Sequence, residues 1–230
     1  MKLAQAICFD LFHTLVDVGR VPESVGRFTA DILGVGRKQW NDACFGPSHV
    51  IWQESDPFET LLQLAQSLVP DISHELVRQA VTERQARFDY ALQHVEEHTL
   101  NALRNLRQQG LRLGLISNAS SSEVQAWDDS PLAELFEVAT FSCSCGYVKP
   151  DMAIYEHTLS ALDVEARHSL FVGDGGSDEH FGAHKTGMKP ILISRFLDHE
   201  EYQRRRDKYR DVLVGEISSL SELADMEGEG

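Results

Sequence analysis

The sequence predicts an α/β fold, in which a parallel sheet carries an all-helical segment inserted after its first strand. Three observations lead to this prediction. Residues 6–9 form a short apolar run, which is typical of a strand buried on both faces. Residues 17–98 show helical periodicity and no convincing strand. From residue 99 onward, strand-like and helix-like segments alternate, which predicts parallel strands joined by right-handed crossovers.

The inserted segment contains four predicted helices. Two have clear start signals, because Asp56 stands before Pro57 as an N-cap and Ser73 can cap the helix that follows it. In chain order, the helices are expected to cover residues 22–33, 37–44, 57–68 and 74–90. We therefore expect a helical cap domain at residues 17–98, with a core domain formed by residues 1–16 and 99–230.

The core domain supplies the other predicted strands. Apolar runs predict strands at residues 111–116, 138–141, 169–172 and 191–193, with a last edge strand within 212–217. Helices are expected at residues 100–109 and 152–162, from Ser121 onward, and in a segment that ends near Lys185. The charge-dense stretch 195–210 is expected to be an exposed loop or helix.

Composition excludes several classes of function. The 230 residues are 42% hydrophobic and 25% charged, as in an ordinary globular protein. No apolar run approaches the length that spans a bilayer, and no secretory leader is apparent, so we expect a cytoplasmic protein without a membrane partner. The net charge of −15 argues against nucleic acid as a partner. The four cysteines are expected to be reduced thiols.

Polar side chains stand at the predicted ends of several strands. Because parallel strands present their carboxyl ends at one edge of the sheet, such residues can meet in a single site. Four short segments fit this arrangement: Asp10-Leu11-Phe12-His13-Thr14, Ser117-Asn118, Lys149-Pro150-Asp151, and Gly173-Asp174 with Asp178 four residues later. Each segment is only modestly specific, but their order and their positions on strand ends make the set informative.

These four segments resemble the motifs of the haloacid dehalogenase (HAD) superfamily, and the resemblance covers the core, about two-thirds of the chain. It implies a Rossmann-like core, the HAD fold, with a helical cap. It also implies that Asp10 is a nucleophile that forms an acyl-phosphate. Ser117 would hydrogen-bond a phosphoryl oxygen, and Lys149 would supply a fixed positive charge. Asn118, Thr14, Phe12 and His13 are further candidates for substrate binding.

The same resemblance implies a magnesium ion as cofactor. Its protein ligands would be the carboxylates of Asp10 and Asp174 and the backbone carbonyl of Phe12, because magnesium prefers oxygen donors. Asp178 would act at the metal from further out, through a metal-bound water. Three clustered carboxylates without a cation would repel one another, which favours a magnesium site. The most favoured function is therefore a magnesium-dependent phosphatase acting on a small phosphorylated metabolite, with a phosphate ester as the expected partner.

Phe12 departs from the phosphatase pattern, which places a second aspartate there as general acid and base. Without that acid, hydrolysis of an alkyl phosphate is expected to slow by about 10²–10⁴. An aromatic residue at this position resembles the haloacid dehalogenases, so hydrolysis of a carbon–halogen bond is the alternative function. A catalytically weak relative that binds a phosphorylated ligand is a second alternative. His13 is a candidate to replace the missing acid, because histidine titrates near neutral pH.

Several further residues have expected roles. The cap is expected to select the substrate, and the candidates to line it are Arg37, Trp40, Phe45, His49 and Trp52. His180 and His184 are four residues apart, but no zinc motif surrounds them, so both are expected on a helix surface. The sequence leaves the identity of the substrate and the oligomeric state open.

Overall fold

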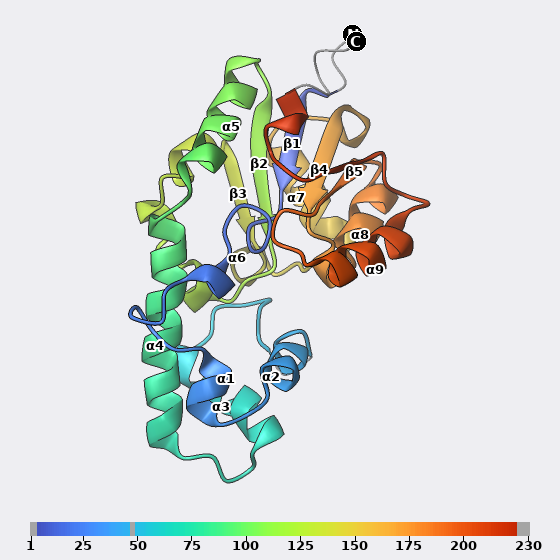
Figure 1. Ribbon diagram of the computed structural model, residues 1–230. Helices are drawn as coiled ribbons and strands as arrows, with labels where there is room; N and C mark the ends of the chain where they lie inside the picture. The colour runs from blue at the N-terminus through green and yellow to red at the C-terminus, as the bar shows by residue number, and fades with distance from the viewer. Residues whose placement is uncertain (1–3, 47–48, 225–230) are drawn as a thin grey trace.

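The computed structural model describes residues 4–46 and 49–224. Its centre is a six-stranded, all-parallel sheet with the order β3-β2-β1-β4-β5-β6 (Figure 1). The α/β fold predicted from the sequence is confirmed. The strands are β1 (Ala6–Phe9), β2 (Arg112–Ser117), β3 (Val138–Phe141), β4 (Ser169–Gly173), β5 (Lys189–Ile193) and β6 (Gly215–Ile217).

Strand β1 lies between β2 and β4, so the order of the sheet reverses beside it. In open α/β sheets, such a reversal leaves a crevice at the carboxyl ends of the strands, where ligands bind. Alternate residues of β1 face opposite sides: Ile7 and Phe9 join one hydrophobic cluster, whereas Ala6 and Cys8 join another. Both sides are covered, which explains why β1 reads as a continuous apolar run.

Helices cover both faces of the sheet. The cluster on the Phe9 side includes Leu103 and Leu106 of α5, and the cluster on the Cys8 side includes residues of α7 and α8. The helices of the core are α5 (Glu97–Gln108), α6 (Ser142–Cys145), α7 (Met152–Ala161), α8 (Glu179–Thr186) and α9 (His199–Tyr209). The four cysteines are free thiols, as expected.

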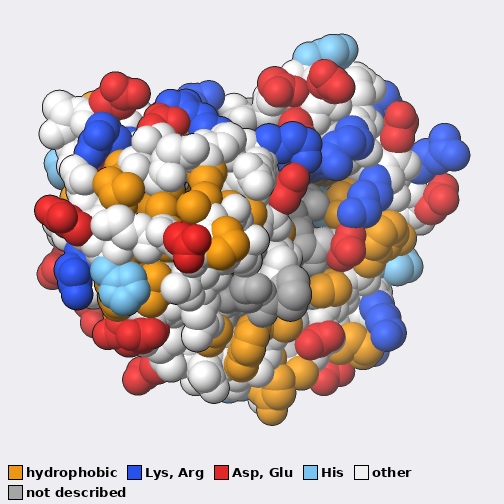
Figure 2. Space-filling view, turned by 90° about the horizontal axis from the view of Figure 1, so that it is seen from below, with side chains coloured by type: hydrophobic (Ala, Val, Ile, Leu, Met, Phe, Trp, Pro, Cys, Tyr) orange, Lys and Arg blue, Asp and Glu red, His pale blue; other side chains and the backbone are white. Residues whose placement is uncertain are grey.

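The inserted segment forms a helical unit beyond the carboxyl ends of the strands (Figure 1). It comprises α1 (Thr29–Leu33), α2 (Arg37–Cys44), α3 (Pro57–Leu68) and α4 (His74–Gln93), which pack around a hydrophobic cluster of their own. The predicted caps form, because the side chains of Asp56 and Ser73 accept hydrogen bonds from the N–H groups of Glu59 and Glu75. On the face seen in Figure 2, acidic and basic side chains are interspersed.

The first predicted helix is much shorter than expected, because residues 22–28 are not helical. This stretch lies against α4 instead. A Cβ added at Gly26 would stand only 2.6 Å from the carbonyl oxygen of Glu83, so glycine permits this close approach. The buried guanidinium of Arg87 donates hydrogen bonds to the carbonyl oxygens of Val18, Val21 and Gly26. In a helix over residues 22–33, the carbonyl of Gly26 would accept from an N–H of the helix, whereas here it accepts from Arg87.

The helix predicted from Ser121 onward also differs from the structure. Residues 121–124 form a single turn of 3₁₀ helix rather than a longer helix, with reciprocal hydrogen bonds between Ser120 and Glu123 at its start.

The long helix α4 also links the insertion to the core. Its residue Leu92 belongs to the hydrophobic cluster of the sheet, so packing does not divide sharply at residue 98. Within the described residues, no helix is long and apolar enough to cross a membrane.

We predict that Arg87→Met lowers the free energy of unfolding by about 3 kcal/mol, because it leaves two buried carbonyl groups and one partly buried carbonyl group without their charged donor. Urea unfolding provides the measurement. Arg78→Met, at an exposed position of the same helix, is the control and is expected to cost less than about 1 kcal/mol. Equal losses in the two variants would show that the hydrogen bonds of Arg87 do not stabilise the fold.

Candidate active site

Asp10 is held directly after β1. Its backbone N–H donates to the carbonyl oxygen of Val172, 2.9 Å away, which continues the pairing with β4. The side chain is almost fully buried, and both of its oxygens accept hydrogen bonds. Thr14 donates to Oδ2 over 2.9 Å, and Lys149 donates to Oδ1 over 2.5 Å. The carboxylate of Asp10 is therefore fixed at the crevice.

Lys149 is buried between two carboxylates. Its Nζ lies 2.5 Å from Oδ1 of Asp10 and 2.7 Å from Oε2 of Glu179. Burial would lower the pKa of Lys149, but the two negative charges outweigh it and raise the pKa above its ordinary value. Asn118 holds the backbone of Lys149 from both sides, because its Oδ1 accepts from the N–H of Lys149 and its Nδ2 donates to the carbonyl. The amine is therefore a fixed positive charge.

Asp174 follows β4 and faces the same crevice. Its N–H donates to Oγ1 of Thr14, so one threonine bridges the two aspartates. Its Oδ1 accepts from the N–H of Gly176 over 2.9 Å, and its Oδ2 lies 2.6 Å from Nη1 of Arg205. Burial raises the pKa of Asp174, while Arg205 opposes the shift.

Glu179 completes a cluster of three buried carboxylates. Ligand oxygens of Asp10, Asp174 and Glu179 all lie within 4.8 Å of one another. Glu179 also accepts a hydrogen bond at Oε1 from the N–H of Gly175. Burial raises the pKa of Glu179 to about 8, with Lys149 opposing the shift and Asp10 adding to it. A set made only of hard oxygen donors fits a magnesium ion.

Ser117 ends β2, the strand next to β1. Its hydroxyl is buried, yet Oγ has no hydrogen-bond partner among residues 4–46 and 49–224. Buried hydroxyls are normally paired, so this group is available to a ligand in the crevice. The structure thus brings Glu179 and four residues predicted from the sequence to one edge of the sheet: Asp10, Thr14, Lys149 and Asp174. Ser117, with its free hydroxyl donor, lies at the end of the neighbouring strand.

Other predicted residues lie outside the carboxylate cluster. The ring of Phe12 meets the ring of Phe88 in α4 edge to face, at 5.1 Å between centroids. His13 is half exposed, and its Nδ1 lies 3.2 Å from the carboxylate of Asp17. Burial lowers the pKa of His13, but the hydrogen bond to Asp17 outweighs this effect and the pKa lies above its ordinary value. The negative charges of Asp174 and Asp10 add to this rise, so His13 pairs with Asp17 and also lies within reach of the charges of the carboxylate cluster.

Asp178 does not join the carboxylate cluster. Its side chain is half exposed and lies 2.5 Å from Nζ of Lys208 in α9. Ser177 and Asp178 both have positive φ, of 50° and 53°, which is uncommon for residues other than glycine. This local turn is followed by Glu179, whose carboxylate enters the cluster. The structure therefore places Glu179 where the sequence suggested Asp178.

Two residues of the site were missed in the sequence. Glu179 directly follows Asp178, and an acid in the first turn of a helix is common, so nothing in the local pattern distinguishes the two. Arg205 lies in the charge-dense stretch, which folds as α9.

The prediction that His180 lies on a helix surface is wrong, because its side chain is fully buried. Burial lowers the pKa of His180 to about 3, so the imidazole is neutral.

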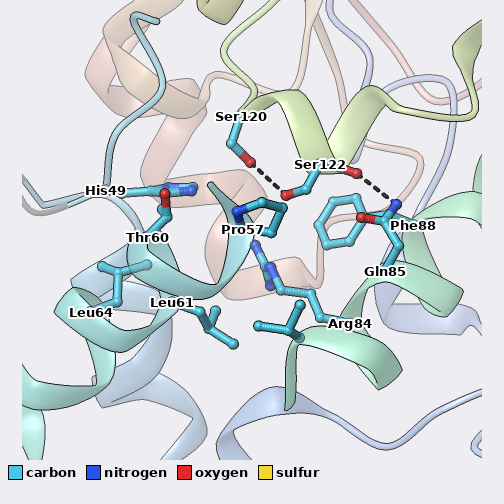
Figure 3. A pocket seen from close by; sticks show the side chains of 11 residues that line it. His49, Pro57, Thr60, Leu61, Leu64, Arg84, Gln85, Phe88, Ser120 and Ser122 are labelled. Atoms are coloured by element: carbon cyan, nitrogen blue, oxygen red, sulfur yellow. Dashed lines mark hydrogen bonds between the residues drawn. The ribbon is translucent and has the colours of Figure 1, made fainter. Parts of the chain in front are cut away.

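The residues suggested for the insertion have different surroundings. Trp40 lies in the hydrophobic cluster of the insertion, Arg37 pairs with Asp31, and Phe45 and Trp52 are exposed. Only His49 among these five lines the small pocket drawn in Figure 3, which lies between the insertion and the core. The pocket is bounded by α3, by Arg84, Gln85 and Phe88 of α4, and by Ser120 and Ser122 of the core. It has room for little more than one water molecule.

A model of the haloacid dehalogenase-like hydrolases matches residues 4–184. The chain belongs to this family. The resemblance suggested by the four motifs is thereby confirmed, and the family consists of hydrolases. The match includes the insertion and all the residues of the carboxylate cluster.

Individual relatives of the family include phosphatases and dehalogenases. The chain is 28% identical over 138 residues to a glyceraldehyde 3-phosphate phosphatase of Methanothermobacter thermautotrophicus, a match covering 58% of this chain and 60% of that protein. Across the curated relatives, the matched region spans 37 to 60% of their lengths.

Solved structures share the fold over almost the whole chain. An L-2-haloacid dehalogenase from Xanthobacter autotrophicus, with chloropropionic acid covalently bound, superposes with a TM-score of 0.70 at 18% identity, covering 98% of this chain and 99% of that one. A HAD phosphatase from Thermococcus onnurineus superposes with a TM-score of 0.63 at 22% identity, covering 97% and 98%. These likenesses establish the fold and leave the reaction open.

We predict that the wild-type protein loses stability relative to Glu179→Gln as the pH rises from about 4.5 to 8 in EDTA. The folded protein holds the proton of Glu179 more tightly than the unfolded chain, whose carboxyl has a pKa near 4.5. The stabilisation is complete below that pH and is lost as the pH rises through the folded pKa of about 8. Urea unfolding of both proteins across this range tests it. Parallel curves would contradict the raised pKa of Glu179.

Proposed function

We propose that the protein is a magnesium-dependent phosphatase that hydrolyses a small phosphorylated metabolite through a phosphorylated Asp10. The observation that supports this most strongly is the cluster of Asp10, Asp174 and Glu179 at the same edge as the unpaired hydroxyl of Ser117. The carboxylate oxygens of Asp10 and Asp174 suit magnesium, Glu179 holds Lys149 beside them, and a free hydroxyl donor suits a phosphoryl oxygen. The relative named as a glyceraldehyde 3-phosphate phosphatase is consistent with a small phosphate ester as substrate.

In the first step, an oxygen of Asp10 attacks phosphorus, the ester bond breaks, and the alkoxide leaves and takes a proton from solvent water. In the second step, water attacks the acyl-phosphate, releasing phosphate and restoring the carboxylate. Thr14 and Lys149 hold the carboxylate for attack through hydrogen bonds to its two oxygens. Lys149 also offsets charge that develops on the phosphoryl group, and Ser117 donates to one of its oxygens. Asn118 acts through Lys149, by fixing its backbone.

The ligands proposed for magnesium are the carboxylates of Asp10 and Asp174 and the backbone carbonyl of Phe12. When bound, the ion would neutralise negative charge shared by the phosphoryl group and the nucleophile. Glu179 supports the same site through Lys149 and the N–H of Gly175. Asp178 acts only indirectly, because its contacts with Lys208 and Tyr209 tie the loop of Asp174 to α9. Lys149 and Arg205 already pair with the three carboxylates, so the repulsion among them is smaller than the sequence suggested.

Hydrolysis of a carbon–halogen bond is the second candidate, and Phe12 is the observation that favours it. Neither Phe12 nor its contact Phe88 can donate a proton, and a departing halide needs none. Attack by Asp10 on carbon would use the same nucleophile. A protein that binds a phosphorylated ligand with little turnover is a third outcome.

The insertion is proposed to act as a cap that selects substrates by size. Phe88 of the insertion touches Phe12, which lies two residues beyond the nucleophile. A ring of the insertion thus packs against the loop that follows Asp10, so movement of the insertion would change the room beside that carboxylate.

The proposal predicts that purified protein releases p-nitrophenol from p-nitrophenyl phosphate with MgCl₂ and loses this activity in EDTA. Asp10→Asn is expected to abolish release, because it removes the nucleophile. Chloride release from 2-chloropropionate in EDTA, without phosphatase activity, would contradict the proposal and support the dehalogenase. Melting shifts caused by phosphate esters, with no turnover of either substrate, would indicate the third outcome.

We also predict that Phe12→Asp raises the turnover of alkyl phosphates at least about tenfold, because it supplies a proton donor for the alkoxide leaving group. Phe12→Asn removes the same ring without adding an acid and serves as the control. Turnover of p-nitrophenyl phosphate is expected to change little, since its leaving group needs no proton. Equal turnover of alkyl phosphates by Phe12→Asp and Phe12→Asn would mean that protonation of the leaving group does not limit the rate.

A further inference from the structure

Helix α9 clamps the loop that carries Asp174. The hydroxyl of Tyr209 donates to the carbonyl oxygen of Gly175 over 2.8 Å. Gly175 has a φ of +88°, and a Cβ added there would stand 2.9 Å from the ring of Tyr209. Lys208 pairs with Asp178, the last residue of the loop. The conformation of this loop therefore depends on a helix that follows β5 and lies outside the four motifs of the family.

Arg205 is the member of this clamp that reaches the carboxylate cluster. Its Nη1 lies 2.6 Å from Oδ2 of Asp174 and donates to the backbone carbonyl of the same residue over 2.7 Å. Its Nε lies 3.3 Å from Glu201, one turn earlier in α9. The guanidinium is largely buried, with 17% of the side chain exposed, so this ion pair is weakly screened by solvent.

Two cationic side chains already offset most of the charge of the three carboxylates. Lys149 is shared by Asp10 and Glu179, and Arg205 contacts Asp174. Both oxygens of Asp174 are also hydrogen-bonded or ion-paired, to Gly176 and to Arg205. A divalent cation that binds Asp174 must share that carboxylate with a positively charged side chain.

We propose that Arg205 is a resident counter-ion of Asp174 that sets the affinity of the site for magnesium. It is a positioning residue. In the ion-free protein it keeps the Asp174 carboxylate in place and paired, and its charge weakens the binding of a divalent cation beside it. This inference rests on the proposed magnesium site. It adds Arg205, which lies outside the family motifs, to the residues that determine how tightly the site binds magnesium.

Calorimetric titration of metal-stripped protein with MgCl₂ tests the inference. Arg205→Gln removes the charge, and we expect it to bind magnesium about tenfold more tightly than the wild type. Arg205→Lys keeps the charge and is expected to bind within about threefold of the wild type. Arg204→Gln, at an exposed neighbour that pairs with Glu201 and not with Asp174, is the matched control and is expected to bind like the wild type.

Thermal unfolding provides a second readout. In EDTA, Arg205→Gln is expected to melt below the wild type and below Arg204→Gln, because it leaves Asp174 without its partner. In MgCl₂, the melting temperature of Arg205→Gln is expected to rise more than that of the wild type. Binding by Arg205→Gln that is equal to or weaker than wild-type binding would overturn the inference, as would an equal change in Arg204→Gln. No heat and no melting shift in any of the four proteins would instead overturn the magnesium site itself, and the inference with it.

Discussion

The buried amine of Lys149 is the interaction on which the site depends. It lies within 2.7 Å of two carboxylates, one after β1 and one at the start of α8. Moving an ammonium group and two carboxylates out of water is costly, and only close mutual contact offsets that cost. If one partner were absent, the others would be buried without compensation. Lys149 lies 139 residues after Asp10 and 30 residues before Glu179, so the contact joins three distant segments of the chain into a single unit.

Around this contact, the fold supplies charges of both signs at one edge of the sheet. The reversal of strand order beside β1 opens the crevice, and Asp10, Asp174 and Glu179 face it. Thr14 links Asp10 to Asp174, while Asn118 fixes Lys149. The resulting group has oxygen donors for a hard cation and a fixed positive charge beside Asp10. Such an arrangement acts by being in place before a substrate binds.

Much of this architecture could be predicted from the sequence. Apolar runs located the buried strands, and Asp10, Ser117 and Asp174 lie at or directly after their ends. Thr14 and Lys149 lie in loops and were found from their motifs. These predictions succeed because a strand buried on both faces has little choice of residue type. The predicted caps Asp56 and Ser73 succeed because capping is local.

The predictions that failed depend on contacts between distant parts of the chain. Two consecutive residues with positive φ, Ser177 and Asp178, precede Glu179 and leave Asp178 facing α9. The sequence near these residues does not reveal that turn. Arg205 reaches Asp174 from 31 residues away, and one arginine in a charged helix resembles its neighbours. The first helix is short because Arg87, far along the chain, binds the carbonyls before it.

The most direct test of the central claim is a crystal structure of the protein with MgCl₂ and tetrafluoroaluminate, a mimic of the phosphoryl group in transfer. The account predicts aluminium in line with an oxygen of Asp10, a magnesium ion bound by Asp10 and Asp174, and Ser117 donating to a fluoride. Density for the mimic away from Asp10, or a magnesium ion that does not contact Asp174, would contradict it.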